Sequence, residues 1–160
     1  MNTTKRINRA YGLLAMIMIG VFFLALPGKA YADLINTDIE YFDDGSYGIT
    51  TYENNLSSIL SVGTVSQTKN YTYYDSNNNK QWKISLSGSF SYTGSSASCT
   101  SASVSYTIYN SNWKVTKAQA SKSGRTATGE FTVKKYVLGV PIKTVNKTLT
   151  LTCSNSGNVT

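Results

Sequence analysis

Hydrophobic residues occupy every second position from residue 82 to residue 92, and serines fill most of the positions between them. The hydrophobic set is Trp82, Ile84, Leu86, Phe90 and Tyr92, with Gly88 in phase, and the polar set is Ser85, Ser87, Ser89 and Ser91. A period of two is typical of a β-strand that buries one face and exposes the other. The segment 82–92 therefore predicts an antiparallel strand with an apolar inner face and a hydroxyl-rich outer face.

The same alternation recurs along the rest of the chain up to residue 153, with turn residues between the runs. Its members are Val104, Tyr106 and Ile108, then Ala127, Phe131 and Val133, and finally Val145, Leu149, Leu151 and Cys153. No helical period follows residue 32, and turn signals divide 65–160 into about seven strands. The pattern predicts an all-β fold, an antiparallel β-sandwich that is immunoglobulin-like or similar, with a small barrel as the second choice.

Residues 33–64 predict an acidic N-terminal hairpin and connector ahead of the sandwich domain at 65–160. Ile39–Phe42 and Tyr47–Tyr52 read as strands on either side of the turn Asp43-Asp44-Gly45-Ser46, where Asp-Gly is a strong hairpin signal. A polar-to-apolar connector follows from residue 54 to residue 63.

Residues 1–32 read as a signal peptide that precedes an exported domain. Lys5, Arg6 and Arg9 precede an uncharged stretch, and Ala30-Tyr31-Ala32 supplies the small residues of a cleavage site. Cleavage is expected between Ala32 and Asp33, which would leave a secreted, extracellular protein. The alternative is an uncleaved N-terminal helix that anchors the chain in the membrane, since the uncharged stretch approaches the roughly 20 residues that a spanning helix needs.

Loss of the leader lowers the formal net charge from +7 to +3, because it removes four basic residues and no acid. The remaining charges are segregated. Residues 33–75 hold seven acids and one base, whereas 76–160 hold ten bases and one acid. Two explanations follow: the two halves face each other, or the basic part meets an anionic polymer such as a teichoic-acid-like component of the cell wall.

The chain has two cysteines, Cys99 and Cys153. In an exported protein an even number of cysteines favours a disulfide, so a Cys99–Cys153 bridge is predicted. Two buried thiols are the alternative.

The sequence offers little for catalysis or for metal binding. It contains no histidine and no G-x-S-x-G motif, which removes the usual general base and the common hydrolase triads. Glu130 could pair with Asp43 or Asp44 only if the fold brought them together. The run from Asp75 to Asn79 mimics half of a calcium loop but reads better as a turn, and a second acidic set comprises Asp38, Glu40, Asp43 and Asp44. We expect no enzyme, no cofactor and no metal.

Tyrosines are the remaining candidates for a binding surface. Tyr71, Tyr73, Tyr74 and Tyr109 could stack on sugar rings or anchor a partner, or they could fill the core.

Several segments between residues 65 and 160 resemble a family of small secreted proteins of Gram-positive Firmicutes that carry a β-rich domain of unknown function. The segments are Tyr71-Thr-Tyr-Tyr74, residues 82–92, Gly94-Ser-Ser-Ala-Ser-Cys-Thr-Ser-Ala102, Thr107-Ile-Tyr109 and Lys147-Thr-Leu-Thr-Leu-Thr-Cys-Ser154. Members often have a further cysteine near the position of Val104, which leaves the partner of Cys99 open. The resemblance implies a secreted β domain and names no activity.

Together these observations predict a secreted, non-catalytic β domain that binds the cell envelope or extracellular polymers, with an anionic wall polymer or a glycan as partner. A secreted effector or bacteriocin-like toxin is the alternative, and an unrecognised hydrolase around Glu130 or the Asp43-Asp44 turn is the third. Nucleic acid is not an expected partner, and a membrane is expected only if the leader is retained.

Overall fold

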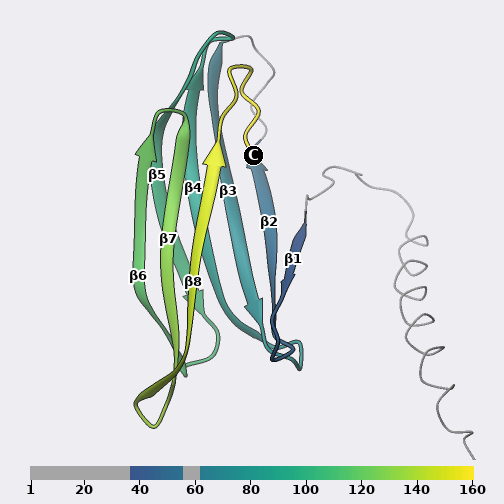
Figure 1. The fold of residues 1–160 in the computed structure, drawn as a ribbon. Coiled ribbons are helices and arrows are strands. Elements are labelled where there is room, and N and C mark those ends of the chain that lie inside the picture. Colours follow the sequence, from purple (N-terminus) through teal and green to yellow (C-terminus); the bar gives the residue numbers. More distant parts are fainter. Residues whose placement is uncertain (1–36, 56–61) are drawn as a thin grey trace, which may run out of the picture. The chain divides into compact units, whose positions relative to one another are not determined.

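The computed structural model describes residues 37–55 and 62–160, which form eight antiparallel strands in two sheets (Figure 1). Sheet A contains β1 (Asp38–Tyr41), β2 (Tyr47–Asn55), β3 (Gly63–Tyr74), β4 (Lys80–Tyr92) and β5 (Ala97–Ile108); sheet B contains β6 (Trp113–Ser123), β7 (Thr126–Val137) and β8 (Val140–Thr152). The leader, the Ala32–Asp33 cleavage site and residues 56–61 of the connector lie outside the described residues. No helix among the described residues has the length and hydropathy needed to cross a membrane.

Each strand pairs only with its neighbours in sequence, so both sheets are meanders. The chain passes from sheet A to sheet B once, between β5 and β6. The all-β sandwich is thus confirmed, but its topology lacks the Greek-key connections of an immunoglobulin sandwich. Residues 63–160 contain six strands, fewer than the seven or so predicted, because β3 to β8 are long, at 11 to 13 residues each.

The predicted hairpin at the N-terminus is part of sheet A. β1 and β2 are joined by the turn through Gly45, whose φ of 77° is the left-handed conformation that the Asp-Gly signal indicates. β2 then pairs with β3 from Tyr47↔Tyr74 to Asn55↔Ser66. The acidic segment therefore extends the same sheet that contains the central strand β4.

The alternation predicted for 82–92 is confirmed, and the inner face of β4 forms the centre of the core. Trp82, Ile84, Leu86 and Phe90 are fully buried between the sheets. Sheet B covers them with the inner residues of its three strands. These are Trp113, Ala127, Phe131, Val133, Val145, Leu149 and Leu151.

The serines of β4 form a ladder of hydroxyl contacts on the outer face of sheet A. Ser89 and Ser87 meet Ser66 and Thr68 of β3, with oxygen–oxygen distances of 2.9 and 2.8 Å. Next along the strand, Ser85 donates a hydrogen bond of 2.6 Å to the side chain of Asn70. The hydroxyls of neighbouring strands therefore satisfy one another on this face, and Asn70 joins them to Glu53, which forms an ion pair with Lys83.

Gly129 lets the two sheets approach closely at the centre of the core. A Cβ atom at this position would lie 2.9 Å from a methyl carbon of Val104 and 3.0 Å from the ring of Phe131. Phe131 is buried and Val104 packs against the core, so neither can move away freely.

We predict that Gly129→Ala lowers the free energy of unfolding by about 1–3 kcal/mol, the usual cost of overpacking a core. Urea denaturation followed by the fluorescence of the buried tryptophans measures the change. Ser121→Ala, at an exposed position of β6, is the control and is expected to change stability by less than about 0.5 kcal/mol. Equal stability of Gly129→Ala and the wild type would contradict the packing described here.

Candidate functional site

One end of the sandwich differs in chemistry from the other. The end where β3, β5 and β7 finish has, in its turns and the adjoining strand ends, six of the nine large hydrophobic residues that are exposed in the described part of the chain. These six are Tyr41, Tyr109, Val137, Leu138, Val140 and Ile142. The turns 93–96, 124–125 and 154–158 at the opposite end consist of Ser, Thr, Gly and Asn with a single Arg125. A binding role is therefore best sought at the first end.

Four lysines lie in two adjacent cross-strand rows of sheet B at this end, and we call Lys114, Lys134, Lys135 and Lys143 the basic end. Lys114 is the direct cross-strand partner of Lys134, and Lys135 is the partner of Lys143. Like charges directly opposite each other in a sheet destabilise it. Successive rows of a sheet point to opposite faces, so Lys114 and Lys134 lie on the outer face, whereas Lys135 and Lys143 share the inner face with the buried Trp113. Each row thus places two positive charges side by side at a cost to the fold.

The surroundings compensate the four ammonium groups unequally. Lys143 forms an ion pair with Asp44. Lys114 and Lys135 lie over aromatic rings, at 5.3 Å from the ring centre of Tyr136 and 6.0 Å from that of Trp113. Within the described residues Lys134 has no ion pair. Positive charge is therefore left over at this end after all internal contacts are made.

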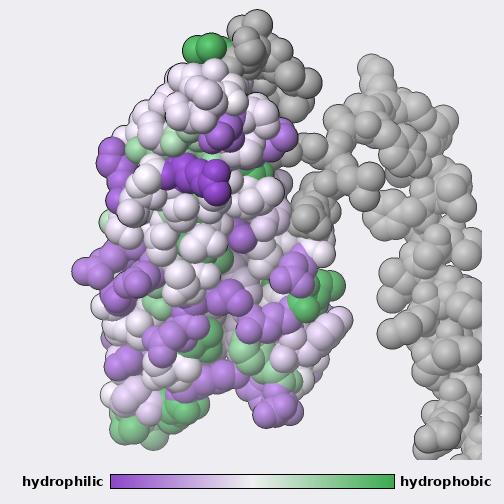
Figure 2. Space-filling view, turned by 45° about the horizontal axis from the view of Figure 1, so that its top comes forward, coloured by the Kyte–Doolittle hydropathy of each residue, from purple (hydrophilic) through white to green (hydrophobic). Residues whose placement is uncertain are grey.

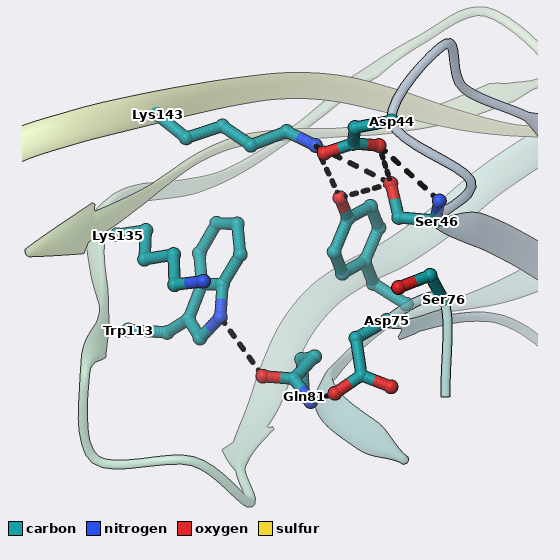
Figure 3. Close-up of a pocket in the computed structure, with 9 residues that line it drawn as sticks. Asp44, Ser46, Asp75, Ser76, Gln81, Trp113, Lys135 and Lys143 are labelled. Atoms are coloured by element: carbon teal, nitrogen blue, oxygen red, sulfur yellow. Dashed lines mark hydrogen bonds and ion pairs between the residues drawn. The ribbon is translucent and has the colours of Figure 1, made fainter. Parts of the chain in front are cut away.

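A small pocket of about 130 Å³ lies beside the basic end (Figure 3). Lys143 donates hydrogen bonds to the carboxylate of Asp44 at 2.5 Å and to the hydroxyl of Tyr73 at 2.6 Å. Tyr73 in turn donates to Ser46 Oγ at 2.6 Å, and Ser46 donates to Asp44. Each hydroxyl in this ring of contacts both gives and receives a hydrogen bond, so the network is closed.

A serine beside a tyrosine and a lysine could suggest an activated nucleophile, but the electrostatics oppose it. Burial by itself would lower the pKa of Lys143, yet the hydrogen bonds to Asp44 and Tyr73 outweigh it and raise that pKa. The amine stays protonated at neutral pH and cannot accept a proton from Ser46. Ser46 is also only 4% exposed. The network holds the β1–β2 turn against β8.

A second lysine of β8 makes a similar contact with β1. Lys147 donates to Glu40 at 2.6 Å and lies 4.3 Å from the ring centre of Tyr71, which also donates to Glu40. The acidic N-terminal hairpin, which we call the acidic head, and the basic part of the chain therefore face each other, which is the first of the two explanations of the segregated charges. Lys143 and Lys147 form ion pairs with the acidic head, whereas Lys114 and Lys134 do not.

In both acidic segments considered for calcium, some carboxylates bond to other groups of the chain. The carboxylate of Asp75 accepts hydrogen bonds from the backbone of Asn77 and Asn79, and Asn78 between them has a φ of 65°. This segment is the β3–β4 turn, as predicted. Among residues 37–55 and 62–160, no three acidic or cysteine side chains gather as metal ligands would.

Glu130 is not brought to the acidic turn. It lies on the outer face of β7, where it accepts a hydrogen bond of 2.6 Å from Lys117. The shallow depression that it lines also contains Gln119, Ala120 and Ser121. Asp44 lies at the end of the sandwich, so the carboxylate pair considered for glycoside hydrolysis does not form in the structure.

The tyrosines divide between the core and the surface. Tyr71 and Tyr73 are buried, so Tyr71 does not lie on an exposed face as the sugar-stacking hypothesis requires. Tyr74 stacks on Tyr47 with ring centres 4.9 Å apart. Tyr109 is half exposed and lines a depression of about 420 Å³. At its base the side chain of Gln81 is already bonded to Asp75, Asn110 and Trp113.

Cys99 and Cys153 are buried free thiols in the structure, so the predicted bridge is absent from it. Each thiol donates to a backbone carbonyl, at 3.2 Å to Ser101 and 3.3 Å to Ser154. The backbone N–H groups of the two cysteines bond to Gly124 and Arg125 of one turn, which places both residues beside it. Burial raises the pKa of both thiols. The disulfide stays a prediction.

The sequence pattern did not predict the side-chain contacts at this end of the sandwich. It did not single out Ser46, Lys143 or the lysine rows, because none of them forms a local motif. The signal that could have found the rows is Lys134-Lys135 followed by a short turn and Lys143, which a hairpin register brings together.

We predict that Asp44 stabilises the fold at neutral pH and stops doing so in acid. The hydrogen bonds from Lys143 and Ser46 lower its pKa from 3.8 to about 2, so its contribution is complete above pH 3.8 and disappears as the pH falls towards 2. Because Asp44 is 55% exposed, the contribution is about 1 kcal/mol or less.

Urea denaturation of the wild type and of Asp44→Asn at several pH values measures this effect. The wild type should be the more stable protein at pH 7, and the difference should vanish in acid. Asp43→Asn is the control, since Asp43 makes no ion pair within the described residues. A difference that does not change with pH would contradict the assignment.

We predict that the chain is exported and that Cys99 and Cys153 are then joined by a disulfide. Its mass without reductant should then be lower by two hydrogens than after reduction, and denaturation with iodoacetamide should add no label until reductant is present. Two labels without reductant would show that both thiols stay free.

No protein-family model matches the chain, and no curated protein matches its sequence. Among solved structures, the crystal structure of a hypothetical protein from Listeria monocytogenes EGD-e is similar to it, with 20% sequence identity and a TM-score of 0.38. The similarity covers 78% of this chain and 92% of that one. That protein is described only as hypothetical, so the match names no activity, and the resemblance to the Gram-positive family stays a prediction.

Proposed function

We propose that the chain is a non-catalytic binding domain that is exported and attaches to an anionic polymer of the cell envelope through its basic end. The observation that carries this proposal is the pair of lysine rows in sheet B. Lys114 faces Lys134, and Lys135 faces Lys143, although such pairs destabilise a sheet on their own. Asp44 already offsets the charge of Lys143 in the second row. An anion bound on the outer face of sheet B would offset the repulsion between Lys114 and Lys134, and this gain stabilises the bound state.

The distribution of charge over sheet B supports the same function. Its three strands contain seven lysines and a single acid, Glu130. Lys117 forms an ion pair with Glu130, and Lys143 and Lys147 form ion pairs with the acidic head. Lys114 and Lys134 lie side by side on the outer face and contact no acid within the described residues. A polymer that carries regular negative charge complements them over several contacts at once.

The absence of catalysis is proposed on the chemistry of the groups present. The chain has no histidine, Lys143 is held as an ammonium ion, and Glu130 has a lysine as its partner. Export is proposed from the sequence of residues 1–32, which has the charge, the apolar stretch and the small residues of a signal peptide.

We predict that Lys114→Gln/Lys134→Gln weakens retention on an immobilised anionic polymer by about 2- to 30-fold, since two exposed charge contacts are lost. The full chain is expressed in a Gram-positive host and purified in the form that the cell produces. Purified teichoic acid on beads is the probe, and the salt concentration that elutes the protein is the measurement.

Lys122→Gln/Arg125→Gln is the matched control, because it removes the same charge from the opposite end of the sandwich. It should elute close to the wild type. An equal loss in both variants would mean that only net charge matters, and failure of the wild type to bind at low salt would overturn the proposal.

A further inference from the structure

The tip of the β7–β8 hairpin, residues 137–142, is an exposed apolar protrusion next to the basic end. Its sequence is Val-Leu-Gly-Val-Pro-Ile, and all four of its large hydrophobic residues are exposed. Leu138 at the apex is 99% exposed. Figure 2 shows hydrophobic side chains gathered at this extremity with hydrophilic ones around them. Such a patch on a small domain usually marks an interaction surface.

The hairpin extends beyond the rest of sheet B. β6 begins at Trp113, which pairs with Lys135. The end of β7 and the hairpin turn after it, from residue 136 onward, therefore extend past the start of β6 and have no neighbouring strand on the β6 side (Figure 1). Val137 pairs with Val140, and only Leu138 and Gly139 lie between them. The tip is therefore a narrow two-stranded ribbon.

Leu138 is an unfavourable residue for the turn it occupies. Both turn residues have positive φ, 49° for Leu138 and 82° for Gly139, and such two-residue turns favour Asn-Gly. A leucine in this conformation costs about 1–2 kcal/mol. Its side chain recovers nothing by burial. An apolar side chain at the apex thus contributes nothing to the stability of the described fold.

Apolar side chains lie on both faces of the ribbon. Paired residues of a hairpin point to the same side, and the next pair points to the other. Val137 and Val140 therefore occupy one face, and Tyr136 and Pro141 the opposite one, with Leu138 at the apex. A protein groove would cover one face of the ribbon, whereas a hydrocarbon phase surrounds all of it.

The lysines behind the tip are placed at the level where lipid headgroups would lie. Lys134 and Lys135 precede Leu138 by four and three residues, which is about 10–13 Å along a strand. Apolar segments at membrane interfaces enter by about 5–10 Å. Tyr136 lies between the tip and the lysines, where tyrosines are favoured at a bilayer surface.

We infer that the β7–β8 tip inserts into the surface of a lipid bilayer that contains anionic lipids, with Leu138 at the deepest point and the basic end on the headgroups. The inference rests on the proposed function, because it uses the same lysines to hold an anionic partner. It adds a specific partner and a second, apolar element to that site.

The test is binding of the full chain to vesicles of phosphatidylcholine with and without 30% phosphatidylglycerol, a probe composition of about one anionic lipid in three. The wild type should co-sediment with the anionic vesicles and much less with the neutral ones. Leu138→Asn should bind the anionic vesicles at least about tenfold more weakly, since it removes the leucine side chain that enters the bilayer.

Leu138→Asn also separates binding from folding. Asparagine suits a left-handed turn position, so this variant should unfold at the same temperature as the wild type or higher. Val62→Asn is the control, because Val62 is an exposed apolar residue outside the basic end. It should bind vesicles as the wild type does.

Each outcome decides the inference. Equal vesicle binding by Leu138→Asn and the wild type, equal binding to neutral and anionic vesicles, or no vesicle binding at all would overturn it. Teichoic-acid retention that depends on Lys114 and Lys134 would then still uphold the proposed function. If Leu138→Asn instead weakens teichoic-acid retention and not vesicle binding, the tip contacts the polymer and the membrane inference fails.

Discussion

The fold depends on the burial of the inner face of β4 between the two sheets. Trp82 stacks on Tyr73 with ring centres 4.9 Å apart and meets Trp113 of sheet B edge-on at 6.0 Å. Each large side chain buried here contributes about 1.5–3 kcal/mol. The Trp82 indole N–H has no acceptor among the described residues, so packing rather than hydrogen bonding fixes this ring. The remaining strands are arranged around this face.

The aromatic cluster of the core also positions the basic end. The ring of Tyr73 lies against Trp82, while its hydroxyl reaches Ser46 and Lys143 at the surface. Tyr73 thus links the packed interior to the contacts that join the β1–β2 turn to β8. The hydrogen bonds of Lys143 fix the start of β8, and the hairpin tip that precedes it extends from this ordered part of the strand.

The two ends of the sandwich differ in composition. At the opposite end, the turns 93–96, 124–125 and 154–158 consist mainly of small polar residues, and the two cysteines lie beside one of them. The end with the hairpin tip instead combines Lys114 and Lys134, which form no ion pair among the described residues, with exposed tyrosines and apolar side chains. Such features lower the stability or solubility of a domain unless a partner covers them. This asymmetry, rather than any single residue, is the basis for placing the binding function there.

The sequence determined what depends on near neighbours. The alternation along β4, the hairpin turn at Gly45 and the left-handed residue at Asn78 were all predictable, because period and turn chemistry are local. Tertiary structure alone decided which distant groups meet. Lys143 contacts Asp44, which lies 99 positions earlier in the chain, and Lys114 lies opposite Lys134 in the sheet. Tyr71 is buried instead of exposed. Strand order and register set these contacts, and both are fixed by how the two sheets pack, which no local pattern records.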